Sequence, residues 1–273
     1  MGRFDGILIC TDLDGTLLRR GDIISEENTE AIEYFKREGG YFTFITGRMP
    51  FFSAHFCDAI RPNAPFGCVN GCGLYDSGRG EYIWTAKMGE GVEELIRAVD
   101  ECFPSVGIQV NTFYHTYFCK ENVTMQSFRR ATGLENLTCD YNAVTEPIGK
   151  ILFGGPDPEE MIAVEAMLRA HPLADRFDFV RSEPTLCEIL PKGIGKGTAI
   201  TRLCEHLGLD IRRSIAIGDY NNDISMFRAA GVGIAVANAC AEAKAAADRI
   251  TVSNEEHAIA RVICDLRDGV FSL

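Results

Sequence analysis

The chain has 273 residues, with 27 lysines and arginines against 39 aspartates and glutamates, and 46% of its residues are hydrophobic. The net charge of −12 leaves no extended cationic surface, which disfavours general nucleic-acid binders and proteins that bind anionic membranes. The hydrophobic content is ordinary for a folded protein, and the length suits one large domain or two modest ones.

The sequence lacks the marks of a membrane or disulfide-rich secreted protein. The longest weakly polar runs, such as 231–237, are far shorter than the roughly 20 residues of a membrane span. The first five residues carry no apolar stretch with a cleavage site. The eleven cysteines include no Cys-x-x-Cys pair, and the five histidines lack zinc-ligand spacing. We therefore expect a cytoplasmic protein with reduced thiols and no zinc site.

Strands and helices alternate at both ends of the chain. The apolar run 6–11 is typical of a strand covered on both faces. After it, the pattern predicts a helix capped by Ser25, a strand at 41–45, a helix from Pro50 and a strand at 66–69. Near the end, it predicts helices at 196–207, through 226–227 and at 241–247, and strands at 214–217, 232–236 and 249–252. This alternation predicts a doubly wound, Rossmann-like parallel sheet, whose ligands gather at the carboxyl ends of the strands.

The middle of the chain has a different pattern, with paired strands and fewer alternations. It predicts helices near 90–102, 121–132 and 157–170, and strands near 106–118, 148–153 and 177–190. We interpret this part as an inserted α+β domain. The expected organisation is a core formed by 1–83 and 189–273, with a cap at 84–188.

Two carboxylates, Asp12 and Asp14, follow the first strand directly. Spaced two residues apart, they can point to the same side where the sheet opens to solvent. At about 4 Å and an effective dielectric near 20, two such anions repel by about 4 kcal/mol, which favours a cation or a shared proton. Asp14-Gly15 alone is also compatible with a simple turn after the strand.

A second acidic cluster follows the predicted strand at 214–217. Asp219, Asn222 and Asp223 lie there, and an Asx-rich helix cap is the plain alternative for this segment alone. Together with Asp12 and Asp14, they place four carboxylates near one edge of the sheet. Oxygen ligands of this kind favour Mg²⁺, which suits a phosphate site.

Three more residues have the chemistry that an anionic substrate needs. Thr46 and Gly47 end the second strand with a hydroxyl donor and an unhindered backbone N–H. Lys196 lies at a predicted helix start, where a cation and backbone donors together favour an anion. A turn and a solvated lysine are the plain alternatives. A nucleotide P-loop is excluded, because that motif needs glycine at Leu190 and a hydroxyl at Gly197.

Taken in order, these motifs resemble those of the haloacid dehalogenase (HAD) superfamily. The matching elements are Asp-x-Asp-x-Thr at 12–16, Thr46, Lys196 and Gly-Asp-x-x-x-Asp at 218–223. The spacing is similar to that of its Cof-type phosphatases of subclass IIB, which carry an α/β cap between the second and third motifs. The resemblance extends over essentially the whole chain. Val236-Ala237 and His257-Ala258 depart from the usual pattern, and neither pair includes a residue of the four motifs.

The resemblance implies a Mg²⁺-dependent hydrolase that works through an aspartyl-phosphate. Asp12 would attack phosphorus, and Asp14 would protonate the leaving oxygen and then activate water. Mg²⁺ would be held by the Asp12 side chain, the Asp14 carbonyl and Asp219.

The resemblance also implies a set of phosphate-binding residues. Phosphoryl oxygens would be bound by Thr46, the Gly47 N–H, Lys196 and Asn222. Asp223 would orient the metal shell. Arg48 fits a second phosphate contact or a loop salt bridge equally well.

We therefore expect a phosphatase for small phosphorylated metabolites, with sugar phosphates as the first substrate class and no nucleic acid, membrane or protein partner implied. A phosphomutase of the phosphomannomutase type and a non-catalytic phosphometabolite sensor are the alternatives. In the cap, Asn111, Tyr114, His115 and Tyr117 are candidates for contacts with the leaving group, or else for packing.

Overall fold

The computed structural model describes residues 2–273, so Met1 of the predicted first core segment lies outside the described residues. The chain divides into two compact units. One unit combines the residues up to Trp84 with Gly195–Leu273, and the other unit is Thr85–Ile194. We call them the core and the cap. No helix within residues 2–273 has both the length and the apolarity to cross a membrane.

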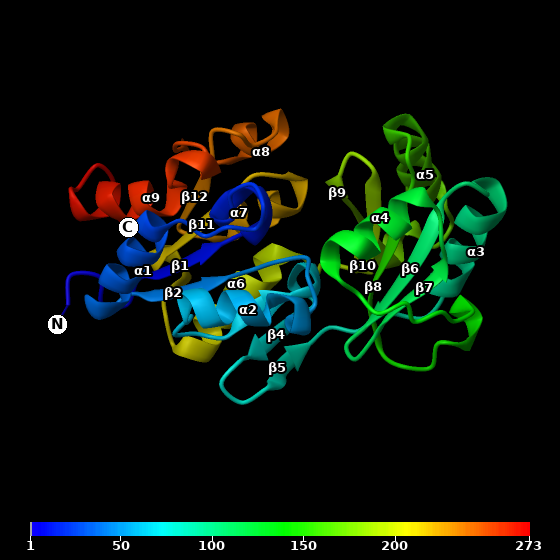
Figure 1. Ribbon diagram of the computed structural model, residues 1–273, viewed down its shortest axis with the longest axis horizontal. Coiled ribbons are helices and arrows are strands. Elements are labelled where there is room, and N and C mark those ends of the chain that lie inside the picture. The colour runs from blue at the N-terminus through cyan, green and yellow to red at the C-terminus, as the bar shows by residue number, and fades with distance from the viewer. Residues whose placement is uncertain (1) are drawn as a thin grey trace. The chain divides into compact units, whose positions relative to one another are not determined.

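The core is built on a five-stranded sheet in the order β13-β12-β11-β1-β2, with every pair parallel. Its strands are β1 (Leu8–Thr11), β2 (Tyr41–Phe44), β11 (Ser214–Gly218), β12 (Val232–Ala235) and β13 (Arg249–Ile250). All four residues of β1 are fully buried, as expected for a central strand covered on both faces. The blue strands from the start of the chain thus lie beside gold strands from its end (Figure 1).

The predicted core helices are confirmed. They are α1 (Glu26–Arg37), α2 (Pro50–Ile60), α6 (Lys196–Leu207), α7 (Ile224–Ala229) and α8 (Ala241–Ala246). The structure adds α9 (Ala258–Arg267) near the C-terminus. Local signals explain the starts of the first two. The Ser25 hydroxyl accepts a hydrogen bond from the Asn28 N–H at 3.3 Å, and Pro50 occupies the first turn of α2.

The third predicted strand does not extend the parallel sheet. β3 (Phe66–Cys68) instead forms an antiparallel sheet with β4 (Gly73–Asp76), which continues to β5 (Glu81–Thr85). Beside the end of β2 it forms a single parallel bridge, Ile45↔Gly67, in place of a paired strand. The turn at Asn70-Gly71 reverses the chain, so that β4 lies antiparallel beside β3. This hairpin takes the place of a longer parallel pairing between β3 and β2.

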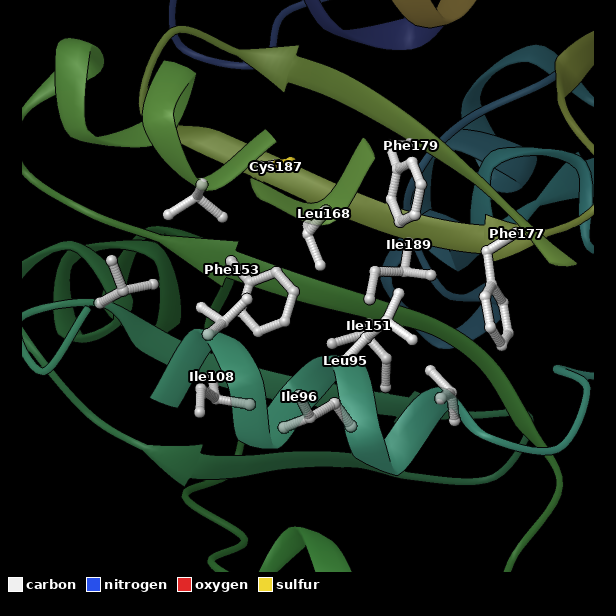
Figure 2. Packing of buried hydrophobic residues seen from close by; sticks show 14 of the residues in the cluster. Leu95, Ile96, Ile108, Ile151, Phe153, Leu168, Phe177, Phe179, Cys187 and Ile189 are labelled. Carbon is white, nitrogen blue, oxygen red and sulfur yellow. The ribbon is translucent and has the colours of Figure 1, made fainter. Parts of the chain in front are cut away.

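The cap has an antiparallel sheet in the order β7-β6-β8-β10-β9. Its elements are α3 (Val92–Cys102), β6 (Gly107–Thr112), β7 (Thr116–Lys120), α4 (Val123–Thr132), β8 (Ile148–Gly154), α5 (Pro158–Ala170), β9 (Phe177–Glu183) and β10 (Leu186–Pro191). One face packs on α3 and α5, where residues such as Leu95, Ile151 and Phe153 form the main hydrophobic cluster (Figure 2). On the other face, Met125 of α4 packs against Phe118 and the strands.

Candidate active site

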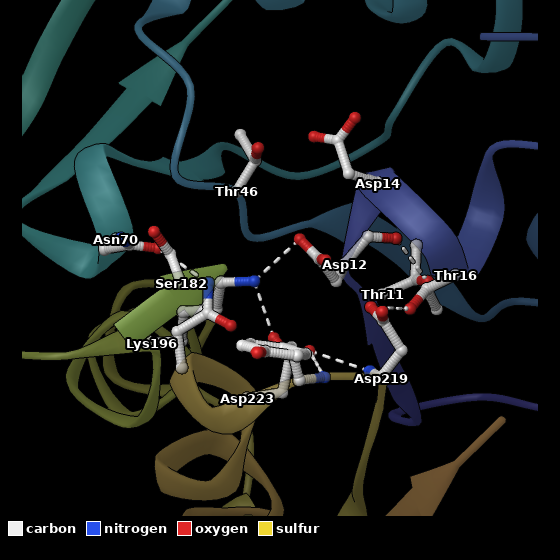
Figure 3. A network of polar contacts seen from close by, with 12 residues as sticks. Thr11, Asp12, Asp14, Thr16, Thr46, Asn70, Ser182, Lys196, Asp219 and Asp223 are labelled. Carbon is white, nitrogen blue, oxygen red and sulfur yellow. Dashed lines mark hydrogen bonds and ion pairs between the residues drawn. The ribbon is translucent and has the colours of Figure 1, made fainter. Parts of the chain in front are cut away.

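Asp12 and Asp14 follow β1 but occupy opposite environments. The Asp12 N–H donates to the Ile217 carbonyl at 2.8 Å, which continues the sheet pairing by one residue, and Asp12 is only 6% exposed. The Asp14 side chain is 54% exposed and points away from Asp12 (Figure 3). The separation follows from the tight turn at Gly15, which has φ +74°, a value that favours glycine. A Cβ at Gly15 would lie 2.6 Å from an Asp219 carboxylate oxygen.

Lys196 lies between two carboxylates in the interior of the site. It is the first residue of α6, as predicted, but its side chain is fully buried rather than solvated. Its Nζ lies 2.6 Å from Asp12 Oδ1 and 2.5 Å from Asp223 Oδ1. Burial alone would lower the pKa of Lys196, but the two carboxylates raise it above its ordinary value, so the ammonium stays charged.

Asp223 is held in place through both of its oxygens. Besides Lys196 at Oδ1, its Oδ2 accepts from the backbone N–H of Asp219 at 2.8 Å and of Tyr220 at 3.0 Å. Gly218 permits this close turn, because a Cβ there would lie 2.5 Å from the Asp223 side chain. An aspartate fixed in this way is suited to orient its neighbours.

The donor set of the site fits a hard divalent cation. Asp12, Asp219 and Asp223 each offer a carboxylate oxygen, and these three oxygens lie within 4.8 Å of one another. Burial of the carboxylate, and to a smaller extent the negative charge of Asp223, raises the pKa of Asp219 to about 7. Burial also raises the pKa of Asp12 well above its usual range, although Lys196 opposes that shift. Carboxylates crowded in this way are relieved by a cation. The Thr16 hydroxyl orients Asp219 through a hydrogen bond of 2.9 Å.

Arg48 forms a salt bridge with Asp14. Its Nε lies 2.9 Å from Asp14 Oδ2 and its Nη2 lies 2.5 Å from Asp14 Oδ1, so the contact is bidentate. Nη2 also lies 3.4 Å from Asp22, and the guanidinium stacks over the Phe56 ring at 5.1 Å. Of the two roles that suit Arg48 by sequence, the structure therefore shows the loop salt bridge, and its carboxylate partner is Asp14.

The remaining predicted phosphate-binding residues lie around the same strand ends. Thr46 is buried, and its Oγ accepts from the Arg48 N–H at 3.2 Å, which leaves the hydroxyl proton available to a ligand. Gly47 follows it and packs closely on Asn70. Asn222 Nδ2 donates to Asn70 Oδ1 at 3.1 Å, whereas Asn222 Oδ1 is buried with no hydrogen-bond partner.

Two residues that support the site were not singled out for it in the sequence. Asn70 is 1% exposed, has a left-handed φ of 53° and orients Asn222. Asn238 donates to the Gly15 carbonyl at 2.8 Å and so braces the loop that carries Asp14. Both are asparagines at turns, which sequence reasoning explains equally well by turn chemistry alone.

The cap carries a buried polar group on the face of its sheet opposite α3 and α5. Asn111 Oδ1 accepts from Gln109 Nε2 at 3.3 Å and from Thr116 Oγ1 at 3.0 Å. Asn111 Nδ2 and Gln109 Oε1 are buried without a partner. On the same face, Lys150 pairs with Glu188 at 3.2 Å. We call Gln109, Asn111, Thr116, Lys150 and Glu188 the polar patch of the cap.

The other cap candidates do not belong to this patch. Tyr114 is 65% exposed, whereas His115 and Tyr117 both bind Glu146. His115 Nδ1 lies 2.8 Å from Glu146 Oε1, and the Tyr117 hydroxyl donates to the same oxygen at 3.1 Å. The three bonds to Glu146, including one from Thr112, outweigh its burial and lower its pKa.

Comparison with known proteins identifies relatives that match most of the chain. The family model for haloacid dehalogenase-like hydrolases matches residues 9–263. The chain is 28% identical over 256 residues to the 5-amino-6-(5-phospho-D-ribitylamino)uracil phosphatase YcsE of Bacillus subtilis, covering 94% of each. A haloacid dehalogenase-like hydrolase from Bacteroides thetaiotaomicron has a TM-score of 0.79 at 27% identity, covering 97% of this chain and 99% of that one.

A HAD subclass IIB sugar phosphatase shares the fold. Its TM-score is 0.83 at 22% identity, with 97% of this chain and 100% of that chain covered. Two units of this kind, an α/β core and a smaller α+β insertion, are therefore found together in other proteins.

Proposed function

The chain belongs to the haloacid dehalogenase-like hydrolase family and is a phosphatase of that family, and from this premise we propose that it hydrolyses small phosphate monoesters through an aspartyl-phosphate. One observation carries the proposal. Lys196 Nζ binds Asp12 at 2.6 Å, while oxygens of Asp219 and Asp223 lie within 4.8 Å of an Asp12 oxygen. The proposed nucleophile, a buried ammonium and the proposed metal ligands thus lie close together, which supports the proposal.

In this proposal, Asp12 is the nucleophile. A carboxylate oxygen forms a bond to phosphorus as the bond to the leaving oxygen breaks, giving an aspartyl-phosphate. The Asp12 N–H bond to Ile217 fixes the backbone of the nucleophile to the sheet. Its orientation therefore needs little adjustment at the moment of attack.

Asp14 is proposed as the general acid and base. It donates a proton to the leaving oxygen and later removes one from the water that hydrolyses the intermediate. Half of its side chain is exposed and its partner is Arg48, so it can move without breaking up the buried Lys196 cluster. We propose that Arg48 orients Asp14 between turnovers.

The transferring phosphoryl group is proposed to bind Thr46, the Gly47 N–H, Lys196 and Asn222. The ammonium and the donors face the region where negative charge grows in the transition state, and such fixed donors act more strongly in a buried site than in water. Asn222 Nδ2 donates to a phosphoryl oxygen when it gives up its hydrogen bond to Asn70.

Mg²⁺ is the proposed cofactor. The Asp12 and Asp219 side chains, with the Asp14 carbonyl, would hold it, and Asp223 would orient this shell. When bound, it supplies positive charge that offsets the repulsion between a carboxylate nucleophile and a phosphate dianion. The raised pKa of Asp219, to about 7, supports this assignment, because it reflects the burial of this carboxylate beside the carboxylate of Asp223, and a bound cation would offset both effects.

Sugar phosphates are the proposed substrate class. The polar patch of the cap offers an unpartnered amide donor on Asn111 and an unpartnered acceptor on Gln109. A hydroxyl group both donates and accepts, so a hydroxyl-rich leaving group satisfies both atoms. An apolar leaving group would give neither atom a partner and so would lack this contribution, about 0.5–1.5 kcal/mol for each hydrogen bond.

The test is phosphate release from a panel of phosphorylated metabolites, with and without Mg²⁺, for the wild type and for Asp12→Asn. We expect release by the wild type with Mg²⁺, and a fall by about four orders of magnitude or more in the variant. Asparagine has the shape of aspartate but is not a nucleophile toward phosphorus. Activity of the variant near that of the wild type would contradict the assignment of Asp12.

The same panel distinguishes the alternatives. A phosphomutase would form an isomer of the substrate in the presence of a bisphosphate activator and release little phosphate. A sensor would bind a metabolite without turnover, and its cellular role would survive Asp12→Asn. Either result would overturn the proposal of a phosphatase.

A further inference from the structure

Two cysteines of the cap lie on neighbouring segments at the edge of its sheet. Cys119 belongs to the edge strand β7, and Cys139 belongs to the segment that follows α4. These segments run parallel, because Tyr117 bridges Leu137 and the Phe118 N–H donates to the Leu137 carbonyl at 2.8 Å. Each cysteine lies two residues beyond the bridged position of its own segment.

A second tie holds the segments together on the far side of the cysteines. Lys120 Nζ lies 2.5 Å from Asp100 Oδ1, and the Tyr141 hydroxyl lies 3.5 Å from Asp100 Oδ2. The carboxylate of Asp100 thus binds one residue from each segment. Cys119 and Cys139 are enclosed between this tie and the bridge at Leu137.

Both thiols also line one open cleft of about 790 Å³. Its wall includes Asp100, Lys120 and Tyr141, so the tie through Asp100 forms part of it. Cys119 and Cys139 are each partly exposed, whereas Cys187 in the same cap is fully buried. A small reagent can therefore reach both thiols without unfolding the cap.

From this juxtaposition we propose that Cys119 and Cys139 form a dithiol site that is converted to a disulfide by exchange with a small disulfide of the glutathione type. One thiolate attacks a sulfur of the reagent and releases its first thiol. The second cysteine then attacks the mixed disulfide and releases the other thiol. The two cysteines lose two electrons and two protons, and the reagent is reduced to two thiols.

The order of attack follows from the surroundings of the two thiols. Cys119 packs against the main hydrophobic cluster of the cap, to which Cys139 does not belong. This burial, and to a smaller extent the neighbouring Cys139, raises the pKa of Cys119 to about 12, so its thiolate is scarce at neutral pH. We therefore assign the first attack to Cys139 and the second to Cys119. The bond would close a loop that contains all of α4, and it would fix the edge of the cap sheet.

The experiment uses the reduced full-length protein in mixtures of oxidised and reduced glutathione, followed by alkylation and peptide mapping. We expect a Cys119–Cys139 crosslink that dithiothreitol reverses. It should be lost in Cys139→Ser and in Cys119→Ser, and kept in Cys102→Ser, whose exposed thiol lies in the same cap. Cys119→Ser should instead accumulate a glutathione adduct on Cys139.

Thermal unfolding provides a second readout. We expect the oxidised wild type to unfold at a higher temperature than the reduced one, with no such shift in Cys139→Ser. Glutathione adducts without a crosslink, or a crosslink between other cysteines, would overturn the proposal. Phosphatase activity is not a readout here, so this test is independent of the proposed function.

Discussion

The core and the cap each bury a lysine, and the two lysines have different charge balances. In the core, Lys196 has two carboxylate partners, Asp12 and Asp223, and Asp219 lies beside them. In the cap, Lys150 pairs with Glu188, whose other oxygen accepts from the Ser182 hydroxyl at 2.6 Å. When all three core carboxylates are ionised, one lysine leaves two negative charges in excess, whereas one lysine against one carboxylate leaves none.

The difference indicates where a cation belongs. Buried ions need compensation, and a protein that leaves an excess of one sign in its interior does so at a cost in stability. The core cluster becomes balanced when a divalent cation joins it. The pair in the cap is already balanced, so it is suited to a neutral polar ligand or to holding the sheet.

The largest expected effect comes from removing the metal. Treatment with EDTA should abolish turnover, and added Mg²⁺ should restore it, because the carboxylates otherwise repel the phosphate dianion. Mg²⁺ should also raise the unfolding temperature of the wild type, and much less that of Asp219→Asn. Full turnover in the chelator, or an equal thermal shift in Asp219→Asn, would contradict the metal site.

Replacing the two lysines tests the comparison directly. Lys196→Met should reduce kcat by about 10²–10³-fold, since it removes a fixed charge facing the phosphoryl group. Lys150→Met combined with Glu188→Gln removes a balanced pair and should leave turnover of p-nitrophenyl phosphate unchanged. Similar losses of turnover in both proteins would mean that the two lysines do not differ as the charge balance predicts.

A smaller effect is expected in the pH dependence of stability. The pKa of Asp219 is about 7 in the folded protein against an ordinary value of 3.8, so between these values the folded state holds more protons than the unfolded state. The contribution of Asp219 to stability without metal therefore falls as the pH rises through this range. Bound Mg²⁺ requires the ionised form, and its affinity should rise over the same range.

Thermal unfolding at several pH values measures this linkage. The shift produced by Mg²⁺ should be larger near pH 8 than near pH 5.5, and the pH dependence of the metal-free protein should be weaker in Asp219→Asn. A shift of equal size at both pH values would contradict the linkage between Asp219 and metal binding.

The smallest effect is expected in the cap. Asn111→Ala removes one amide of the polar patch, and we expect KM for a sugar phosphate to rise by about 2–10-fold, the worth of one hydrogen bond. Turnover of p-nitrophenyl phosphate should not change. Tyr114→Ala, at an exposed position outside the patch, is the matched control. Equal effects of Asn111→Ala on both substrates would indicate a structural role instead.

Local signals explain why so much of the fold can be predicted from the sequence. Ser25 and Pro50 mark helix starts within one turn, and the apolar run of β1 identifies a central strand. The position of β3 could not be predicted in the same way. Its apolar residues suit a parallel strand beside β2 and an antiparallel strand beside β4 equally well. β4 follows β3 directly along the chain, and β3 pairs with it.

The site shows the same division between local and distant information. Asp12, Thr46, Lys196 and Asp219 stand at element ends that the sequence marks, so their placement at one edge of the sheet could be anticipated. The bidentate pairing of Arg48 with Asp14 could not, because it depends on side-chain directions across two loops. The burial of Lys196 was missed for a similar reason, since its carboxylate partners are distant in the sequence.

The interleaving of the core strands has a consequence for synthesis on the ribosome. β1 pairs with β2 on one side and with β11 on the other, so its second neighbour emerges only after the whole cap has been made. The cap is one continuous stretch of chain and can pair its strands as soon as it emerges. The unit that starts first is therefore completed last, and until then the apolar strand β1 has only β2 of its two strand neighbours.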